Sequence, residues 1–398
     1  MRVVIVGAGV AGCVMARHLS RLDGLDVICL ERVTRDDHSE AGTGLNVGPN
    51  AVKALRLVDP ELADAITRAS YAWRNWRISL TDGTVLFDLP LTEVAEGPGW
   101  RIRWSELYRV LREAAHGNVQ YGCDIVSIGR DPREARKTSV VWTMDGAEHR
   151  LDGIDLLIAA DGRYSQARRA MSGEPRVEHI GVAIFRLLVP DTSGGLIDDY
   201  EQWFNGPNRL LAFRVPPGHI YIAGTFPIAP DAEIAAHMKS IDRLRSAYTP
   251  STSLPGAQAH WMIDSICGNV GDTHWARMQE HGLLYRASDC NVLYLGDAAH
   301  GMVPTLGQGA TQAIEDAANA AAIIASRYRE GSRNVDAWLD EIESRRRDRM
   351  RFVMAFSLDA TDTMLAGADP VRGTLHKNEP GFRDRLKLLY RNVGLPLQ

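Results

Sequence analysis

The chain opens with a short apolar segment that runs directly into closely spaced glycines. Residues 3–6 are all apolar, and Gly7, Gly9 and Gly12 follow. In such a segment the first glycine permits a tight turn, the second lets the backbone approach a pyrophosphate, and the third lets the next helix pack closely. The sequence therefore predicts a buried parallel strand, a phosphate-binding turn and a helix over residues 10–22, which together begin an α/β dinucleotide-binding fold.

An acidic residue closes the second expected strand of this unit. Residues 25–30 read as that strand, which ends at Glu31, about 20 residues beyond Gly12. An acid there binds a ribose hydroxyl and disfavours a 2′-phosphate, so this segment predicts FAD or NAD rather than NADP. The alternative is a structural glycine turn with Glu31 merely ending a strand. Ala11 and Arg32 complete the candidate cofactor-binding residues here.

Two later segments repeat the pattern of an apolar strand followed by glycine. Asp161-Gly162 follows the apolar residues 156–160, and Gly296-Asp297 precedes Pro304 and residues 307–309. A dehydrogenase that binds NAD needs only the first segment. Three such turns therefore predict that the chain wraps around one long diphosphate cofactor, which favours FAD.

These three motifs, in this order, resemble the class A flavoprotein monooxygenases, the aromatic hydroxylase family whose type member is p-hydroxybenzoate hydroxylase. The resemblance covers roughly residues 1–330 and is strongest at 157–168 and 295–310. It implies an α/β fold in which a Rossmann-like FAD-binding domain (the GR2/PHBH fold) is interrupted by a mixed β-sheet substrate domain. A helical segment is expected at the C-terminus.

The expected domain boundaries follow the changes in sequence pattern. The discontinuous FAD-binding domain is predicted to comprise residues 1–72, 99–170 and 280–326. Strand-like alternation places the substrate domain at 73–98 and 171–279, with a hairpin turn at 81–84 and further strands at 179–189, 209–215 and 219–226. Residues 327–398 are expected to be helical and to serve packing or dimer contacts.

The resemblance also implies roles for residues of the third segment. Asp297 would accept hydrogen bonds from the ribityl hydroxyls, and Pro304 would border the oxygen-reactive edge of the flavin. A helix beginning near Gly309, with Gly307 before it and Ala310 in its first turn, would direct its partial positive charge at the flavin.

Two positions depart from the family pattern. The family usually has an arginine, in contact with the FAD phosphate, three residues before a helix leucine. In this chain the residue three positions before Leu107 is Trp104. The phosphate contact is therefore assigned to Arg103, one residue earlier. The family often has an asparagine two residues after the last glycine of the third motif, where this chain has Thr311.

Arg209 and Tyr221 are the candidate substrate-binding residues. Their offset and flanking sequence resemble the pyridine-ring branch of the family, which includes 2-methyl-3-hydroxypyridine-5-carboxylate oxygenase. A guanidinium suits a planar carboxylate because it donates two parallel hydrogen bonds. The alternatives are a surface arginine beside a half-buried sheet tyrosine, and a strand register that places Arg214 opposite Tyr221. His300 is more readily structural than catalytic.

The implied reaction is hydroxylation of a small aromatic or heteroaromatic acid through a flavin C4a-hydroperoxide, with ring opening as an open variant. NADH or NADPH and O2 would be the co-substrates. Three alternatives remain: a flavin halogenase, whose WxWxIP-type motif is not found; an isoprenoid-type flavin reductase or epoxidase; and a non-catalytic flavin redox sensor.

Composition excludes several other classes. A net charge of −5 predicts no broad basic surface for nucleic acid. The arginine-rich run 345–351 has acids nearby and is predicted to form the solvated face of a helix. No apolar stretch reaches 18 residues, so no membrane span is expected. The 5 scattered cysteines lack metal-ligand spacing and indicate free thiols in the cytoplasm. A monomer or homodimer is expected.

Overall fold

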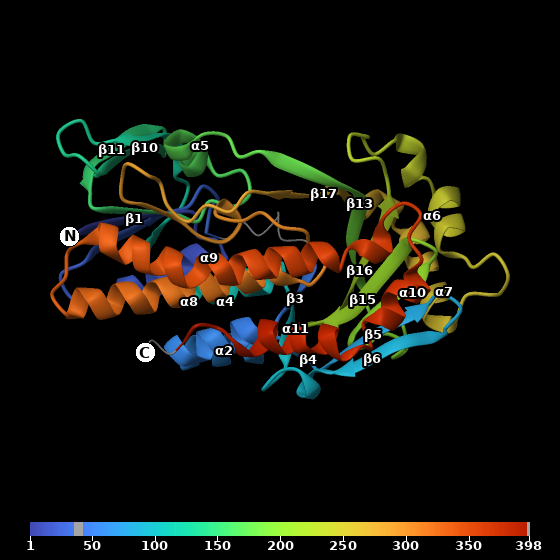
Figure 1. Cartoon of the computed structure of the whole chain (residues 1–398). Helices are drawn as coiled ribbons and strands as arrows, with labels where there is room; N and C mark the ends of the chain where they lie inside the picture. Colours follow the sequence, from blue (N-terminus) through green and yellow to red (C-terminus); the bar gives the residue numbers. More distant parts are fainter. Residues whose placement is uncertain (36–42, 116, 396–398) are drawn as a thin grey trace.

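The computed structural model describes residues 1–35, 43–115 and 117–395. The molecule is elongated, with a parallel sheet near the two termini and a larger mixed sheet at the opposite end (Figure 1). Long helices run along the molecule from the first sheet toward the second. Within the described ranges, no helix combines the length and the hydropathy that a bilayer crossing requires.

A five-stranded sheet carries the predicted dinucleotide-binding unit, and all of its strand pairs are parallel. The strands, in spatial order, are β18 (Val292–Tyr294), β12 (Leu156–Ala159), β1 (Arg2–Val6), β2 (Asp26–Leu30) and β8 (Val119–Gln120). The carboxyl ends of parallel strands meet at one edge of a sheet. The residues after β1, β12 and β18, which are the three predicted cofactor segments, therefore lie together although the sequence separates them.

Both faces of this sheet are covered, which explains its continuous apolar strands. Val3 and Ile5 pack with the helices on one face, and Val4 and Val6 pack toward the other face. The helices are α1 (Val10–Leu19), α4 (Trp104–Ala114) and α8 (Gln308–Arg329). The other face is covered by a three-stranded antiparallel sheet of β9 (Asp124–Arg130), β10 (Thr138–Met144) and β11 (Ala147–Ile154).

The second large sheet has seven strands and is mixed, because β14 and β5 pair in parallel while the other pairs are antiparallel. Its strands are β17 (His274–His281), β13 (Val177–Pro190), β16 (His219–Pro227), β15 (Asn208–Val215), β14 (Tyr200–Asn205), β5 (Asn75–Leu80) and β6 (Val85–Pro90). The predicted hairpin around residues 81–84 is the β5–β6 connection, with Ile78 paired to Phe87.

Alternation along these strands gives the seven-stranded sheet two different faces. One face packs Phe185, Leu210 and Ile222 against α6 (Ile241–Tyr248) and α7 (Ala257–Gly268). The other face carries Arg186, Arg209 and Tyr221 and forms one wall of a cleft. Apolar packing therefore fixes the register that directs the polar residues into this cleft.

A small antiparallel sheet lies between the two large ones, and further helices cover it. Its strands are β3 (Gly44–Val47), β7 (Gly99–Arg103) and β4 (Tyr71–Trp73). Helices α2 (Pro49–Val58) and α3 (Pro60–Arg68) pack against it, whereas α5 (Gln166–Ser172) contacts β9 of the other three-stranded sheet. Single 3-10 turns occur at Leu91–Glu93, Ala236–Lys239, Val270–Asp272, Gly296–Ala298 and Asp362–Met364.

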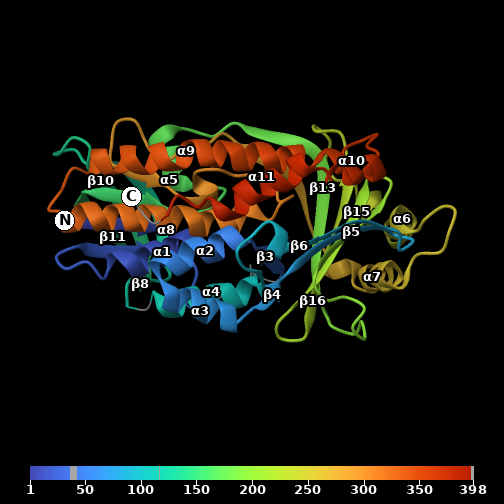
Figure 2. The same cartoon turned by 60° about the horizontal axis from the view of Figure 1, so that its bottom comes forward.

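The region predicted to be helical at the C-terminus consists of α9 (Val335–Asp359), α10 (Pro370–His376) and α11 (Pro380–Arg391). Figure 2 shows α9 and α11 running along one side of the molecule, with α10 beside the seven-stranded sheet. These helices join the main core, which includes Val353, Phe356 and Leu389. The domain boundaries stay a prediction, and two of them fall inside the strands β4 and β17.

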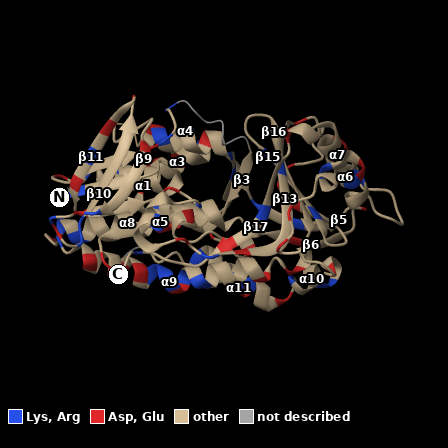
Figure 3. Ribbon diagram, turned by 90° about the horizontal axis from the view of Figure 1, so that it is seen from above, with Lys and Arg blue, Asp and Glu red and all other residues tan. Residues whose placement is uncertain are grey.

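The prediction for the arginine-rich run is wrong for two of its members. Arg346 is 1% exposed, and Arg349 pairs with the fully buried Glu315. The reason is that acids on α8 face this side of α9. The rest of the helix fits a solvated face, since Figure 3 shows basic and acidic ribbon segments together on α9. Arg347, for example, pairs with Glu343 on the same helix.

Phe356→Ala tests whether α9 is part of the core. Phe356 is fully buried and packs edge-on to Phe382 of α11 at 5.3 Å between ring centroids. Its truncation should lower the free energy of unfolding by about 3–5 kcal/mol in urea titrations. The control on the same helix is Leu358→Ala, which is 37% exposed and should cost less than about 1 kcal/mol. Equal effects of the two substitutions would contradict this packing.

Candidate active site

Two adjoining clefts open at the carboxyl edge of the five-stranded sheet, with volumes of about 440 and 300 Å³. Both volumes are in the range of small-molecule sites. Gly9, Tyr108 and Gly162 line both clefts, so the two form one continuous groove. The predicted residues on the first cleft are Gly7, Gly9, Glu31, Arg32 and Asp161. Those on the second are Gly9, Ala11, Asp297, Pro304, Gly307, Gly309, Ala310, Arg209 and Tyr221.

The first glycine segment has the geometry that its predicted roles require. Gly7 adopts a φ of +94°, and a Cβ there would lie 2.5 Å from the carbonyl oxygen of Ala160. A Cβ on Gly12 would lie 1.8 Å from the carbonyl oxygen of Gly7, so only glycine permits α1 to pack this closely. Gly12 therefore does not line a cleft but sets the helix behind it, and α1 begins at Val10 with its free amides at the groove.

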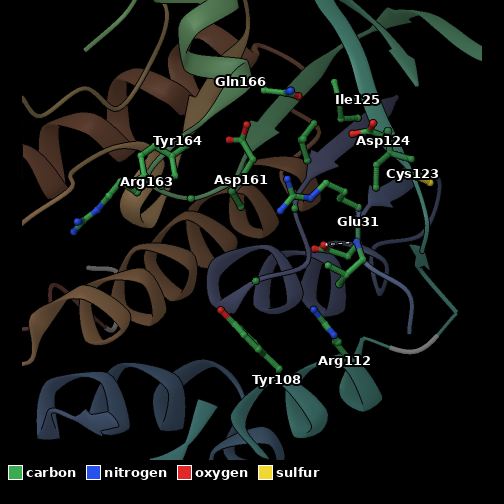
Figure 4. Close-up of a pocket in the computed structure, with 18 of the residues that line it drawn as sticks. Glu31, Tyr108, Arg112, Cys123, Asp124, Ile125, Asp161, Arg163, Tyr164 and Gln166 are labelled. Carbon is green, nitrogen blue, oxygen red and sulfur yellow. Dashed lines mark hydrogen bonds between the residues drawn. The ribbon is translucent and has the colours of Figure 1, made fainter. Parts of the chain in front are cut away.

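Glu31 connects the end of β2 to the glycine turn. Its carboxylate accepts hydrogen bonds from the backbone N–H of Ala8 at 2.6 Å and of Val33 at 3.1 Å. The side chain lines the first cleft, where the sequence predicts a ribose contact (Figure 4). Two carboxylate oxygens offer more acceptor sites than these two donors use, so a ribose hydroxyl can still be bound.

Helix α4 supplies a side of the groove that the sequence reasoning missed. Figure 4 shows Tyr108 and Arg112 reaching from α4 into the first cleft, whereas Arg103 lines neither cleft among the described residues. Trp104, Tyr108 and Arg112 are four residues apart and share one helix face, and this spacing was the available signal. Arg112 is thus better placed than Arg103 for a phosphate contact, because Arg103 only precedes α4 as its N-cap.

The side chain of Asp161 holds the second cofactor segment in place. Asp161 accepts hydrogen bonds from the Ser165 hydroxyl at 2.5 Å and from the Ala167 N–H at 3.1 Å, so the carboxylate fixes the turn into α5. Burial raises the pKa of Asp161 above its usual value. The buried Arg168 on α5 donates to the carbonyl oxygens of Ala298 and Ala299, which ties the second segment to the third.

The third segment forms the floor of the second cleft. Helix α8 begins at Gln308, close to the predicted start, so its N-terminal amides and partial positive charge lie at the cleft. Thr311, the residue that departs from the family pattern, accepts a hydrogen bond from the Gly48 N–H and donates one to the Gly307 carbonyl. Thr311 therefore braces this loop against the loop after β3.

A buried ionic network holds the Gly296 turn from behind. Asp316 on α8 accepts hydrogen bonds from the Gly296 N–H and the Tyr285 hydroxyl, and it lies 2.5 Å from His300 Nε2. Arg346 on α9 donates to Asp316 and to Glu315. His300 is thereby bound to a carboxylate and does not line either cleft among the described residues, which supports a structural role.

This network depends on ionised carboxylates. Burial alone would raise the pKa of Glu315, but Arg346 and Arg349 lower it to about 2. Burial also opposes ionisation of Asp316, whose pKa is nevertheless held well below its usual value by His300 and Arg346.

The substrate candidates Arg209 and Tyr221 lie on the same face of the seven-stranded sheet, in the wall of the second cleft. They are not direct partners, because Arg209 pairs with Thr225 and Tyr221 with Phe213. The alternative register is wrong: Arg214 pairs with Ile220 and forms an ion pair with Asp191 at 2.8 Å. Burial is the main cause that lowers the pKa of Arg209 and raises that of Tyr221 to about 12.

Comparisons with known proteins agree with this geometry. Residues 257–357 match the sequence family described as an FAD binding domain. The chain is 28% identical over 333 residues to a 2-heptyl-3-hydroxy-4(1H)-quinolone synthase of Pseudomonas aeruginosa, covering 80% of this chain and 79% of that protein. It is 27% identical over 376 residues to a 6-hydroxynicotinate 3-monooxygenase of Pseudomonas fluorescens, covering 90% of this chain and 91% of that protein.

The fold has a solved counterpart in Klebsiella pneumoniae HpxO complexed with FAD and uric acid. The TM-score is 0.77 at 22% identity, covering 97% of this chain and 92% of that chain. The matched FAD binding domain and the relatives named as monooxygenases support a class A flavoprotein monooxygenase. The predicted family, the predicted PHBH-type fold and the predicted cofactors FAD, NAD(P)H and O2 are confirmed at this level. The roles of individual residues in this monooxygenase stay predictions.

The groove fits FAD in this chain's own geometry. It is continuous from the Glu31 end to the start of α8, and the backbone approaches it at Gly9, where a Cβ would meet only the Ala160 oxygen at 3.9 Å. Glu31, Arg112 and the α1 N-terminus would hold the ADP half, and Asp297 with the start of α8 would hold the flavin half.

Gly9→Val separates cofactor binding from folding. The fold has room for this side chain, but it would project into the groove that both clefts share. We expect a variant with wild-type circular dichroism and a 450 nm absorbance at least about tenfold lower than that of wild type after FAD incubation. Gly12→Val, which has no room beside Gly7, should fail to fold. FAD retained by a folded Gly9→Val variant would refute the proposed path of the cofactor.

Arg346→Met tests the buried network. Loss of the guanidinium removes the partner that Glu315 and Asp316 share and leaves only Arg349 on Glu315 and His300 on Asp316 as cationic partners, so it should cost about 3–5 kcal/mol of unfolding free energy at pH 7. Because the pKa of Glu315 is depressed from 4.5 to about 2, the stabilisation in wild type is present above pH 4.5 and is lost as the pH falls toward 2. The variant should therefore unfold at a higher pH in acid titrations.

The matched control for Arg346→Met is Arg347→Met. Arg347 is the next residue of the same helix; it is exposed and pairs with Glu343 one turn earlier. Its loss should leave both the unfolding free energy and the acid midpoint unchanged. Identical acid midpoints for the two variants would show that the network does not stabilise the protein.

Proposed function

We propose that this monooxygenase uses FAD, NAD(P)H and O2 to hydroxylate a small aromatic or N-heteroaromatic acid. The observation that carries the proposal is the position of Arg209. This residue is 3% exposed and lines the cleft beside the third cofactor segment. Its Nε atom has no hydrogen-bond partner among the described residues. A buried guanidinium is costly unless a ligand supplies its counter-charge, so an acidic substrate is favoured.

The rest of the cleft suits a flat ring. Apolar side chains of Ile184, Leu211 and Met302 line it together with Ala223. Such walls exclude water and leave orientation to a few polar groups. A bound ring would therefore lie between the sheet and the loop at Pro304, with its acidic group directed to Arg209.

Tyr221 serves as a hydrogen-bond donor in this proposal. Because burial raises its pKa to about 12, its phenol stays neutral near pH 7 and can donate to an oxygen of the ring. This excludes a phenolate of Tyr221 as the resting base. Proton removal from a ring hydroxyl would then pass to an ordered water or to solvent.

FAD, when bound, supplies the redox chemistry: it accepts hydride from NAD(P)H and activates O2 for transfer of one oxygen atom to the ring. The residues of the chain bind and orient the cofactor and the substrate. The α8 N-terminus would stabilise negative charge that develops on the flavin ring, and the apolar wall limits access of water.

The relatives support the substrate class without fixing it. The name of one relative, 6-hydroxynicotinate 3-monooxygenase, gives an N-heteroaromatic acid as its substrate. Names of others give 3-amino-4-hydroxybenzoate and 6-methylsalicylate. We propose a substrate of this kind, with simple hydroxylation rather than ring opening as the default outcome.

A panel of hydroxybenzoate and hydroxypyridine carboxylates tests the proposed function. At least one member should accelerate NAD(P)H oxidation by the holoenzyme and appear as a hydroxylated product in mass spectrometry. A redox sensor would bind FAD but show no substrate-stimulated oxidation. Failure of a broad panel of aromatic acids to stimulate oxidation would contradict the hydroxylase proposal.

Arg209→Ala should raise KM for the accepted acid by about tenfold to a hundredfold, because a charge-assisted hydrogen bond contributes about 1.5–3 kcal/mol. FAD content should match that of wild type, since Arg209 lies on the sheet wall. The control is Arg214→Ala on the same strand, which should leave KM unchanged because Arg214 pairs with Asp191. An unchanged KM in Arg209→Ala would remove Arg209 from the site.

A further inference from the structure

A second arginine, Arg186 on β13, lines the same cleft as Arg209. Its Nε atom is also buried without a hydrogen-bond partner among the described residues. Sequence reasoning assigned Arg186 no role, because the apolar strand around it does not show which way its side chain points. Two guanidinium groups thus point from one sheet face into one small cleft.

The strand register fixes where these arginines stand. Arg186 pairs with Ala223 of β16, and Arg209 of β15 pairs with Thr225 of the same strand. Strand β16 lies between β13 and β15. The two arginines therefore flank the central strand, about 10 Å apart across the sheet and two residues out of register.

The surface between them is shaped to receive a ligand. Ala223 is directly beside Arg186 and presents only a methyl group, and Tyr221 is the next residue on this face. Arg186, Arg209 and Tyr221 all line the second cleft, and both guanidinium groups oppose the rise that burial causes in the pKa of Tyr221. A ring placed over Ala223 would have one arginine on each side.

In the part of the chain that the structure describes, no acid on this sheet face pairs with Arg186 or Arg209. The described residues that line the second cleft include one acid, Asp297, and three arginines, Arg163, Arg186 and Arg209. Asp297 belongs to the opposite side, in the turn after β18 that leads to α8. A ligand with a single carboxylate could compensate one of the two sheet arginines and would leave the other, the buried Arg209 or the half-buried Arg186, without a counter-charge.

We propose that the substrate carries two anionic oxygen groups on opposite sides of one aromatic ring, with Arg209 binding one group and Arg186 the other. This proposal rests on the proposed function and narrows its substrate class. The second group is a carboxylate or an ionised ring hydroxyl, since a guanidinium binds either through charge-assisted hydrogen bonds. Arg186 is then the residue that determines preference for such diacids.

Equilibrium binding to the FAD-loaded enzyme tests this preference without turnover. The probes are two matched pairs: benzoate with terephthalate, and nicotinate with pyridine-2,5-dicarboxylate. Binding is followed through the change in flavin absorbance at fixed ionic strength. We expect the Kd of each diacid to be at least about tenfold lower than that of its monoacid, which corresponds to about 1.4 kcal/mol.

Variants assign the preference to Arg186. Arg186→Met should weaken diacid binding by at least about tenfold and leave monoacid binding nearly unchanged. Arg186→Lys keeps the charge and should recover part of the difference, and it also serves if the methionine variant does not fold. The control is Arg214→Met, which should alter neither Kd because Arg214 pairs with Asp191.

Three results would overturn the proposal: equal affinity of the wild-type enzyme for a diacid and its monoacid, equal weakening of both by Arg186→Met, or no diacid binding at millimolar concentration. These outcomes are distinct from failure of the proposed function. An enzyme that prefers diacids but never oxidises NAD(P)H in their presence would retain the anion site and lose the hydroxylase assignment.

Discussion

The buried carboxylates of Glu315 and Asp316, compensated by Arg346, are the interaction on which the arrangement of the site depends. Asp316 holds the Gly296 turn, and Glu315 accepts a hydrogen bond from Asn50 at the start of α2. Arg346 brings α9 into the same network. The C-terminal helices are therefore part of what positions the cofactor loops, although they line neither cleft among the described residues.

The cofactor groove could be predicted from the sequence because its signals are local. A glycine that must bring two backbones together has no substitute, and Gly7 and Gly12 meet that condition in the structure. The apolar strands before each turn are short and continuous because they are buried on both faces. Parallel pairing then places all three turns at one edge of the sheet. The prediction of a common groove therefore did not depend on how many residues separate the turns in the sequence.

The charged residues could not be predicted in the same way, because their environment is set by distant partners. Arg346 looks solvated in a run of arginines, yet its acids lie about 30 residues earlier on another helix. Arg186 depends on the register of three strands, and Arg112 on the face that α4 turns toward the groove. In each case the sequence shows which residue is present but not the direction in which its side chain points.

Together these features describe a chain whose beginning, middle and late segments grip one FAD and present its flavin to a positively charged, apolar-walled cleft. The most direct measurement is the absorbance spectrum of the purified protein after incubation with FAD and removal of the excess. The account predicts a yellow protein with close to one FAD per chain. A folded protein that stays colourless would contradict it.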